Sequence, residues 1–311
     1  MFDESKIKGN HKISNIKEIY NYKKKIDYIV SGISGVEGIE INLKLLKLCK
    51  NLLIANKETI ICGGKFFLSE AKKNKYNILP IDSEHFSLNF FLKNFTKKIN
   101  IKRIFLTASG GPFLKKKIKY NQSLKTVLKH PNWKMGDKIT VDSSTFANKV
   151  LELFEAKILF NLDPSKIKII VENKSNVHSI IEFENNIIFQ VLHTPNMQIP
   201  ISNSLHVKNN FRFKLNKFSI DLLYPSIQKF PIIALGYKIL NNFGDSGMIY
   251  FTVINQRLVE RFLKNKIKYG EISKILVKTF KQKHIINKSC KKVRNYNDIV
   301  KTIIDAKKIR L

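Results

Sequence analysis

Two acidic residues just after a short apolar stretch could bind one divalent cation. Asp82 and Glu84 stand two positions apart in the segment ILPIDSEHF. At the end of an extended strand, side chains with this spacing project to the same side. Two carboxylates that converge offer the oxygen ligands that hard cations such as Mg²⁺ prefer. The spacing therefore predicts a candidate metal site.

A third carboxylate, Glu152, belongs to an apolar segment that predicts a helix beginning near Ser143. Asn148 and Lys149 precede Glu152 by four and three residues, so the three polar side chains share one face of this helix. A solvent-exposed face with an i,i+3 salt pair would produce the same pattern. From spacing alone the exposed salt pair is the favoured explanation, and a metal ligand is the alternative.

Two short segments could bind a phosphate group. Ser109-Gly110-Gly111 follows an apolar run, and glycines let backbone N–H groups approach an anion closely, although this triplet is also a common turn. Ser143 and Ser144 are expected at a helix N-terminus, where free N–H groups attract anions, although simple capping explains them too. Each segment alone is a weak signal.

The segment from His130 to Gly136, HPNWKMG, contains Trp133, the only tryptophan of the chain. Proline and glycine flank this tryptophan, which indicates a loop. An aromatic side chain in a loop often fills a gap in the packing. It can equally belong to a lid that closes over a substrate and excludes water.

Alternating strands and helices must position the first of these residues. The pattern predicts a buried strand at 26–31, then a glycine-containing turn and a helix through Ile41 and Leu45. Further strands are expected at 52–55 and 78–81, with a helix around 66–72 between them. Alternation of this kind favours a parallel sheet.

The middle of the chain reads as a mixture of strands and helices. Strands are expected at 103–108, 166–172, 177–183 and 187–193, and the last two form a hairpin across Asn185-Asn186. After a connector at 207–228 without sustained periodicity, the pattern becomes helical from Pro231 onward. The last helix is expected at 299–309, so the tail predicts a small helical bundle.

Composition limits the classes of protein that fit. The chain has 311 residues, three cysteines (Cys49, Cys62 and Cys290) without zinc-site spacing, and neither a signal-peptide pattern nor an apolar run long enough to span a membrane. We therefore expect reduced thiols and a cytoplasmic protein. Only six of the 56 basic residues are arginines, and the lysines are spread along the chain. The net charge of +32 thus favours a solvated surface over specific nucleic-acid recognition.

Five motifs follow one another along the chain. They are ANKE (Ala55–Glu58), DSEH (Asp82–His85), LTASGGPF (Leu106–Phe113), HPNWKMG (His130–Gly136) and KITVDSSTFANKVLELFEAKILFN (Lys138–Asn161). In this order they resemble the motifs of the 1-deoxy-D-xylulose 5-phosphate reductoisomerase family, most clearly between about residues 26 and 205. The resemblance implies an NADPH-dependent enzyme that converts 1-deoxy-D-xylulose 5-phosphate to 2-C-methyl-D-erythritol 4-phosphate in isoprenoid precursor synthesis. It also implies a homodimer.

The resemblance assigns roles to individual residues. Asp82, Glu84 and Glu152 would hold Mg²⁺ or Mn²⁺, and Lys57 would be the active-site lysine beside the metal. The substrate contacts would be Ser83, Glu84, Ser109, His130, Ser143, Asn148, Lys149 and Glu152. Asn56, Glu58 and Gly136 would meet NADPH, and Trp133 and Met135 would belong to the lid.

The fold expected from both arguments is α/β, in four parts. A partial Rossmann-like parallel-sheet domain is expected at 1–81 and an α+β catalytic domain at 82–206, followed by a linker at 207–228 and a C-terminal helical domain at 229–311. The first domain is expected to be partial because the family's glycine fingerprint, G-x-T-G-S-I-G, has no counterpart: Gly9 is the only glycine before Gly32. We therefore expect a chain that is N-terminally truncated relative to the family, with weakened NADPH binding.

Other departures from the family lie outside the metal and phosphate residues. The family's H-P-Q-S is replaced by Glu172-Asn173-Lys174-Ser175, and its Asn-rich helix is reduced to Ile254-Asn255-Gln256. Two alternatives to the enzyme remain open. One is a degenerate, non-catalytic relative that binds metal and phosphosugar, and the other is a basic nucleic-acid-binding protein.

Overall fold

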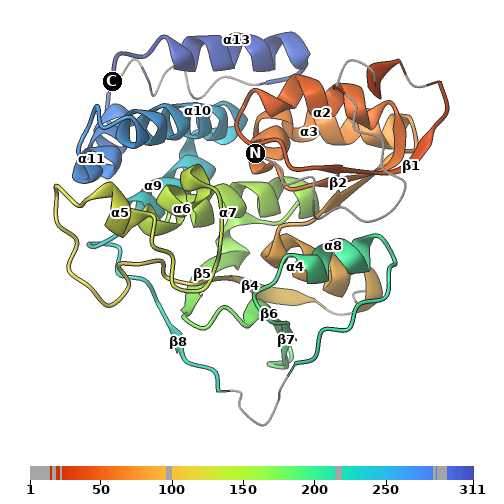
Figure 1. Ribbon diagram of the computed structural model, residues 1–311, viewed down its shortest axis with the longest axis horizontal. Coiled ribbons are helices and arrows are strands. Elements are labelled where there is room, and N and C mark those ends of the chain that lie inside the picture. The colour runs from red at the N-terminus through yellow and green to blue at the C-terminus, as the bar shows by residue number, and fades with distance from the viewer. Residues whose placement is uncertain are drawn as a thin grey trace.

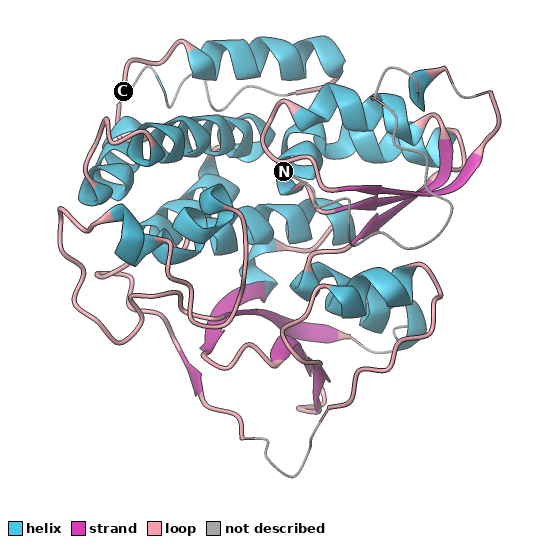
Figure 2. Ribbon diagram, viewed as in Figure 1, coloured by secondary structure: helices cyan, strands magenta, loops and turns pink. Residues whose placement is uncertain are grey.

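The computed structural model describes residues 15, 19–21, 23–95, 100–213, 219–282, 285 and 293–311. In this part of the chain two β-sheets lie at adjoining sides of a group of helices (Figure 1, Figure 2). The three-stranded sheet lies to the right in Figure 1, the five-stranded sheet lies at the bottom, and the C-terminal helices lie at the upper left.

The first sheet is parallel, with strand order β1-β2-β3, as predicted. Its strands are β1 (Ile26–Ser31), β2 (Cys49–Ile54) and β3 (Asn77–Pro80), connected by α2 (Gly38–Leu46) and α3 (Lys57–Lys73). α3 begins well before the expected position because Asn56 caps it, accepting a hydrogen bond from the backbone N–H of Thr59. The cap places Lys57 in the first turn of α3, at the carboxyl end of β2.

The second sheet is mixed, with order β7-β6-β4-β5-β8. It comprises β4 (Ile101–Ala108), β5 (Ile167–Glu172), β6 (Val177–Phe183), β7 (Ile188–Leu192) and β8 (Leu222–Leu223). β4 and β5 are parallel, whereas the other neighbours are antiparallel. The predicted hairpin is confirmed as β6-β7. The predicted connector is wrong in one detail, because β8 within it adds a short edge strand.

Two long helices pack on the second sheet: α4 (Ser83–Phe95), which the periodicity did not predict, and α7 (Ala147–Phe160). The prediction of one helix starting near Ser143 is wrong. A separate helix, α6 (Asp137–Thr145), ends there, because Phe146 adopts a left-handed conformation (φ 65°) and separates α6 from α7. Ser143 therefore lies in the last turn of α6. Shorter helices in this region are α5 (Leu124–Val127), η2 (Pro164–Lys166) and α8 (Gln198–Ser204).

The tail is helical, as predicted, and its helices are α9 (Pro231–Asn242), α10 (Gly244–Leu263), α11 (Tyr269–Thr279) and α13 (Tyr296–Lys307). α13 begins earlier than expected because Asn295 is its cap: the Asn295 side chain accepts from the backbone N–H of Asp298. α10 packs against α3, α6 and α13, so the tail contacts the first sheet's helix layer directly.

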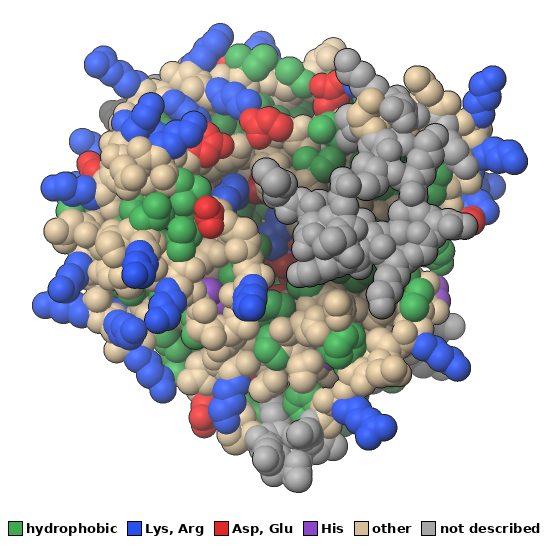
Figure 3. Space-filling model, in the orientation of Figure 1, with side chains coloured by type: hydrophobic (Ala, Val, Ile, Leu, Met, Phe, Trp, Pro, Cys, Tyr) green, Lys and Arg blue, Asp and Glu red, His purple; other side chains and the backbone are tan. Residues whose placement is uncertain are grey.

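A continuous cluster of buried apolar side chains joins the parallel sheet, α7 and the tail helices. The four-part division of the chain stays a prediction. Cys49 and Cys62 are buried free thiols, whereas Cys290 lies outside the described residues. None of the helices in the described ranges combines the length and apolar character needed to cross a bilayer. On the face shown in Figure 3, lysine and arginine side chains are scattered and not gathered in one patch.

Candidate active site

Asp82 and Glu84 are positioned by the turn that leads from β3 into α4. The backbone carbonyl of Asp82 accepts from the N–H of Phe86 at 2.7 Å, and its side-chain Oδ1 accepts from the N–H of Glu84 at 3.3 Å. Glu84 already lies in the first turn of α4. The extended strand end expected here is therefore wrong, but the helix start brings the two carboxylates to the same side.

Glu152 joins these two carboxylates from the middle of α7. One oxygen from each of Asp82, Glu84 and Glu152 lies within 4.8 Å of the others. Asn148 donates to Glu152 Oε1 at 2.5 Å, and Lys149 donates to Glu152 Oε2. Glu152 is only 1% exposed. The explanation by an exposed helix face is therefore wrong, because the i,i+3 ion pair is buried.

Two ammonium groups compensate part of this negative charge. Lys57 Nζ lies 2.6 Å from Asp82 Oδ2, and Lys149 Nζ lies 2.9 Å from Glu84 Oε1. Burial by itself lowers the pKa of both lysines, but the surrounding carboxylates outweigh it and raise the pKa above the usual range. Burial, together with the charge of Asp82, raises the pKa of Glu152 to about 8. The raised pKa of Glu152 indicates that the two ammonium groups do not fully compensate the charge of the three carboxylates.

Behind the carboxylates lies a buried histidine that no sequence argument singled out. His85 Nδ1 is 3.0 Å from Asp82 Oδ1 and 3.4 Å from Glu155 Oε2, and its Nε2 is 3.0 Å from the backbone oxygen of Glu152. Burial alone lowers the pKa of His85, but the carboxylates of Glu155 and Asp82 raise it to about 9. The imidazolium thus donates on both sides and orients Asp82 toward the cluster. His85 belongs to the DSEH motif, and Glu155 belongs to the motif that ends at Asn161. The spacing of the two residues gave no reason to select either of them.

The two candidate anion segments meet on the other side of the pocket. Gly111 is left-handed (φ 62°) and packs so closely on α6 that a Cβ there would lie 3.0 Å from the carbonyl oxygen of Ser143. Ser109 Oγ is 3.0 Å from His130 Nε2. Because His130 Nδ1 accepts from the backbone N–H groups of Asn132 and Trp133, Nε2 must carry the hydrogen and donate to Ser109. Burial lowers the pKa of His130 to about 4, which keeps the ring neutral.

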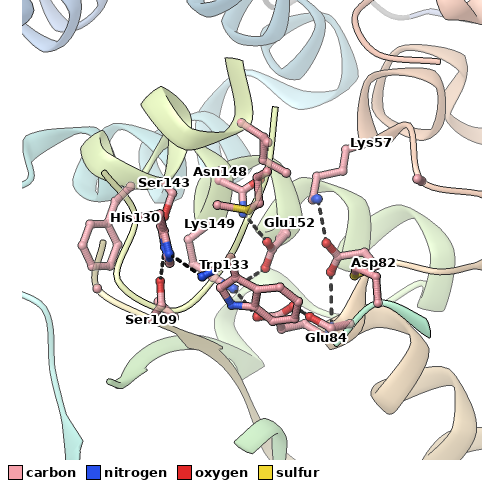
Figure 4. Close-up of a pocket in the computed structure, with 18 of the residues that line it drawn as sticks. Lys57, Asp82, Glu84, Ser109, His130, Trp133, Ser143, Asn148, Lys149 and Glu152 are labelled. Carbon is pink, nitrogen blue, oxygen red and sulfur yellow. Dashed lines mark hydrogen bonds and ion pairs between the residues drawn. The ribbon is translucent and has the colours of Figure 1, made fainter. Parts of the chain in front are cut away.

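One cavity of about 280 Å³ opens onto the carboxylates and the anion segments (Figure 4). The predicted site residues that line it are Lys57, Asp82, Ser83, Glu84, Ser109, His130, Trp133, Met135, Ser143, Asn148, Lys149 and Glu152. Met197, from the segment before α8, also lines it and had no recognisable signal in the sequence. The side chain of Trp133 lies across the cavity in Figure 4 and meets the ring of His178 edge-on.

An adjoining cavity of about 380 Å³ holds the remaining predicted residues, Asn56, Glu58 and Gly136. Lys57 and Asn148 line both cavities, so the two spaces meet between α3 and α7. The amide of Asn56 is already occupied, because Nδ2 donates to the carbonyl oxygens of Ile33 and Gly35. Asn56 thereby fixes the turn after β1 as one wall of this second cavity.

The arrangement has the chemistry of a metal-assisted site for an anionic substrate. Three carboxylates can share one hard cation, while hydroxyl, amide and ammonium donors face the same space. The second cavity could take a ring-sized ligand beside it.

Three protein-family models match successive parts of the chain, and all three describe the same enzyme. Residues 3–64 match the model described as 1-deoxy-D-xylulose 5-phosphate reductoisomerase. Residues 78–160 match the model of that enzyme's C-terminal domain, and residues 192–309 match a second model described as DXP reductoisomerase C-terminal domain. The matches thus extend through the helical tail.

Curated relatives carry the same name. A 1-deoxy-D-xylulose 5-phosphate reductoisomerase from Pelagibacter ubique is 39% identical over 317 residues, which cover 96% of this chain and 80% of that relative. The enzyme of this name from Treponema denticola is 38% identical, over 81% of this chain and 68% of its own length. Among solved structures, a DOX-P reductoisomerase in complex with NADPH, fosmidomycin and magnesium is 31% identical and has a TM-score of 0.83, covering 94% of this chain and 76% of that chain.

Proposed function

The chain belongs to the 1-deoxy-D-xylulose 5-phosphate reductoisomerase family, and we propose that its two adjoining cavities form a single active site. The reaction is the NADPH-dependent conversion of 1-deoxy-D-xylulose 5-phosphate to 2-C-methyl-D-erythritol 4-phosphate. One observation carries the assignment to these cavities. Asp82, Glu84 and Glu152 converge in the first cavity, and this cavity shares the lining residues Lys57 and Asn148 with the second.

The residues present fit a divalent metal. Their ligand atoms are all carboxylate oxygens, the donor type that Mg²⁺ and Mn²⁺ prefer. The pKa of Glu152 is raised by burial and by Asp82, which indicates a place for further positive charge. When bound, the metal supplies Lewis-acid polarisation of substrate oxygens. Asp82, Glu84 and Glu152 would hold it, and His85 would keep Asp82 in orientation.

Lys57 and Lys149 would act as fixed positive charges during the rearrangement. Both remain protonated, because neighbouring carboxylates raise their pKa values despite burial. Lys57 lies between the two cavities, so its ammonium can stabilise negative charge that develops on a substrate oxygen close to the cofactor. Ser83 lines the same cavity as Lys57 and donates to Glu84.

The phosphate group of the substrate would lie at the opposite end of the first cavity. Ser109 and Ser143 offer neutral hydrogen-bond donors there. Asn148 and Lys149, which also contact Glu152, add an amide and a charge on the side of the carboxylates. His130 donates to Ser109 Oγ, which leaves the serine hydroxyl hydrogen free for the ligand. Trp133 and Met135, from the loop after His130, would cover the bound substrate and exclude water.

The second cavity suits the nicotinamide end of NADPH, which supplies the hydride. Its walls come from the turn after β1, from Asn56 and Glu58 at the start of α3, and from Gly136. Glycine at 136 leaves open space, because no atom lies within 4 Å of where a Cβ would stand. The walls join the first cavity at Lys57 and Asn148, so a bound ring would face the reacting carbon atoms.

Neither alternative that the sequence left open is supported. The curated relatives and the solved structure described above all carry the reductoisomerase name, and none of them carries the name of a nucleic-acid-binding protein.

The experiment that tests the function is NADPH oxidation by the purified chain with 1-deoxy-D-xylulose 5-phosphate and Mn²⁺. We expect turnover, and we expect Glu152→Gln to reduce kcat and Mn²⁺ affinity together, by about 100-fold or more, because the ligand charge is lost. Glu40→Gln, which alters an exposed glutamate paired with Lys44 on α2, is the matched control and should behave like the parent. Absence of turnover by the parent at saturating metal and cofactor would sink the proposal.

We further propose a homodimer in the cytoplasm. Exposed apolar side chains at both edges of the second sheet, among them Ile188 and Tyr224, support an interface there. The unpaired thiols of Cys49 and Cys62 support a reducing compartment. Sedimentation velocity tests the dimer, and cell fractionation tests the location: a monomer, or recovery with the envelope, would contradict each part in turn.

A further inference from the structure

A buried chain of polar side chains connects three helices next to the second cavity. Lys138, in the first turn of α6, lies with Nζ 2.7 Å from Glu58 Oε1 and 2.8 Å from Asp142 Oδ2. Asp142 Oδ1 accepts from Asn255 Nδ2 of α10 at 2.7 Å. Glu58 belongs to the first turn of α3. The ammonium group therefore ties α3 to α6, and the hydrogen bond of Asp142 to Asn255 extends the connection to α10.

The partners of this ammonium are buried, although 22% of the Lys138 side chain is exposed where it lines the second cavity. Glu58 is 6% exposed, Asp142 is 1% exposed and Asn255 is fully buried. Burial by itself lowers the pKa of Lys138, but Asp142 and Glu58 raise it above the usual range, so the group stays charged. Apolar side chains of similar size would hold helices together at least as strongly as a buried ion bridge. The bridge instead contributes to positioning. It fixes the distance between the two carboxylates and hence between the helices that carry them.

The helices in question carry residues of both cavities. Next to Glu58 on α3 is Lys57, whose ammonium lies 2.6 Å from Asp82. At the start of α6 is Gly136, which ends the Trp133 loop, and in its last turn is Ser143, which lines the substrate cavity. Lys138 itself lines only the cofactor cavity. Because Lys138 does not line the substrate cavity, a change at Lys138 would reach that cavity through the placement of α6 relative to α3.

We propose that Lys138 is a positioning residue that holds α6 against the N-terminus of α3, so that a ligand in one cavity favours binding of a ligand in the other. The inference rests on the proposed function, since its two ligands are the cofactor and a substrate analogue of that enzyme. Direct binding of a cofactor phosphate by Lys138 is a poor alternative, because its ammonium already serves two carboxylates.

The test compares the parent with Lys138→Met by titrating fosmidomycin in the presence of Mn²⁺, with and without NADPH, and recording the fluorescence of Trp133. In the parent, NADPH should tighten fosmidomycin binding. In Lys138→Met we expect fosmidomycin binding to weaken about tenfold or more, and we expect most of the NADPH-dependent gain to disappear. Lys138→Arg keeps the charge and should restore part of that gain.

Glu58→Gln separates positioning from a direct cofactor contact. If Glu58 acts through Lys138, then Lys138→Met and Glu58→Gln together should affect binding no more than the larger single change. Additive effects would instead indicate two independent roles and would overturn the proposal. Lys44→Met removes a lysine with an equally short but exposed ion pair, to Glu40, and should leave both affinities within about twofold of the parent.

Different results would contradict the proposed function and the positioning role of Lys138. If the parent does not oxidise NADPH with substrate at saturating metal and cofactor, the proposed function fails. If the parent is active and Lys138→Met keeps the full NADPH-dependent gain in fosmidomycin affinity, the positioning role of Lys138 is wrong. If Lys138→Met does not fold, Glu58→Gln replaces it in the test, because this variant leaves Lys138 paired with Asp142. A Glu58→Gln variant with an unchanged NADPH-dependent gain in fosmidomycin affinity would overturn the proposal.

Discussion

His130 shows how a single side chain can connect the anion segment to the loop that contains Trp133. Its Nδ1 accepts from two backbone N–H groups of that loop, and its Nε2 donates to Ser109. The two hydrogen bonds that Nδ1 accepts require the neutral ring, because the protonated ring carries a hydrogen on Nδ1. Because burial lowers its pKa to about 4, the ring meets this requirement over the physiological range.

The lowered pKa makes His130 a source of acid sensitivity. In the unfolded chain a histidine titrates near pH 6.5, so between about pH 6.5 and 4 the unfolded state binds more protons than the folded state. The contribution of His130 to stability is therefore complete above pH 6.5 and declines as the pH falls through this window. We expect the parent to lose more free energy of unfolding between pH 7 and pH 5 than His130→Asn, whose Oδ1 can replace Nδ1 as acceptor. Urea denaturation at the two pH values measures both.

The same comparison controls for other histidines with lowered pKa values. His178 and His193 are buried and stacked, and burial lowers the pKa of each, but both are present in the parent and in the variant. Their contributions cancel in the difference. Equal losses for the parent and His130→Asn would mean that His130 is not held neutral in the folded chain.

Among the helices, α7 determines the site most directly, because it carries Asn148, Lys149 and Glu152. Its opposite side packs against α9 at an unusually short distance. A Cβ built on Gly236 of α9 would lie 2.6 Å from Cγ1 of Val150. The absence of a side chain at 236 is what allows α9 to support α7 so closely.

Because of this contact, we expect the effect of Gly236→Ala on the free energy of unfolding to depend on the side chain at position 150. Alanine is favoured over glycine inside a helix by about 1 kcal/mol, whereas overpacking a dense core costs about 1–3 kcal/mol. We expect Gly236→Ala to lower the free energy of unfolding in the parent, by up to about 2 kcal/mol. In a Val150→Ala background, where the obstructing methyl groups are gone, the same substitution should be neutral or stabilising. A double-mutant cycle by chemical denaturation checks this, and the same sign in both backgrounds would contradict it.

The elements that could be predicted from the sequence are those whose order depends on local apolar runs. The strands of the parallel sheet and the β6-β7 hairpin follow from such runs and from turn residues such as Asn186, which is left-handed (φ 65°). α4 escaped prediction because its buried side includes the polar Ser83 and His85, while Phe90 is exposed. A helix that faces a polar site lacks the apolar stripe by which helices are recognised.

The sequence predicted which residues belong to the candidate site better than it predicted their burial and contacts. Spacing selected Asp82 and Glu84, although for the wrong backbone conformation, and it could not decide whether Glu152 was buried. Burial depends on contacts between α4 and α7, which are far apart in the sequence. The same reason explains why His85 and Lys138 were missed: each has its role through partners that the chain brings together only on folding.

On the scale of the whole molecule, a net charge of +32 opposes association while exposed apolar groups favour it. The apolar groups are concentrated at the second sheet. Ile187, Ile188 and Phe189 lie at its β7 edge, and Tyr224, 67% exposed, follows β8 at the other edge. Added salt screens the repulsion between two chains but does not weaken apolar contact. Higher salt should therefore favour the proposed dimer.

Substitution at the β8 edge tests whether this sheet forms the interface. Tyr224→Lys adds a charge to a side chain that contributes little to the fold, so the monomer should remain stable while the dimer dissociates. Ile304→Lys is the matched control, since Ile304 is 44% exposed on α13, at the top of Figure 1 and away from the second sheet. In sedimentation velocity we expect twice the chain mass of 36.1 kDa for the parent and for Ile304→Lys, and the single mass for Tyr224→Lys. A dimer that dissociates with Ile304→Lys and not with Tyr224→Lys would place the interface on the helical side of the molecule.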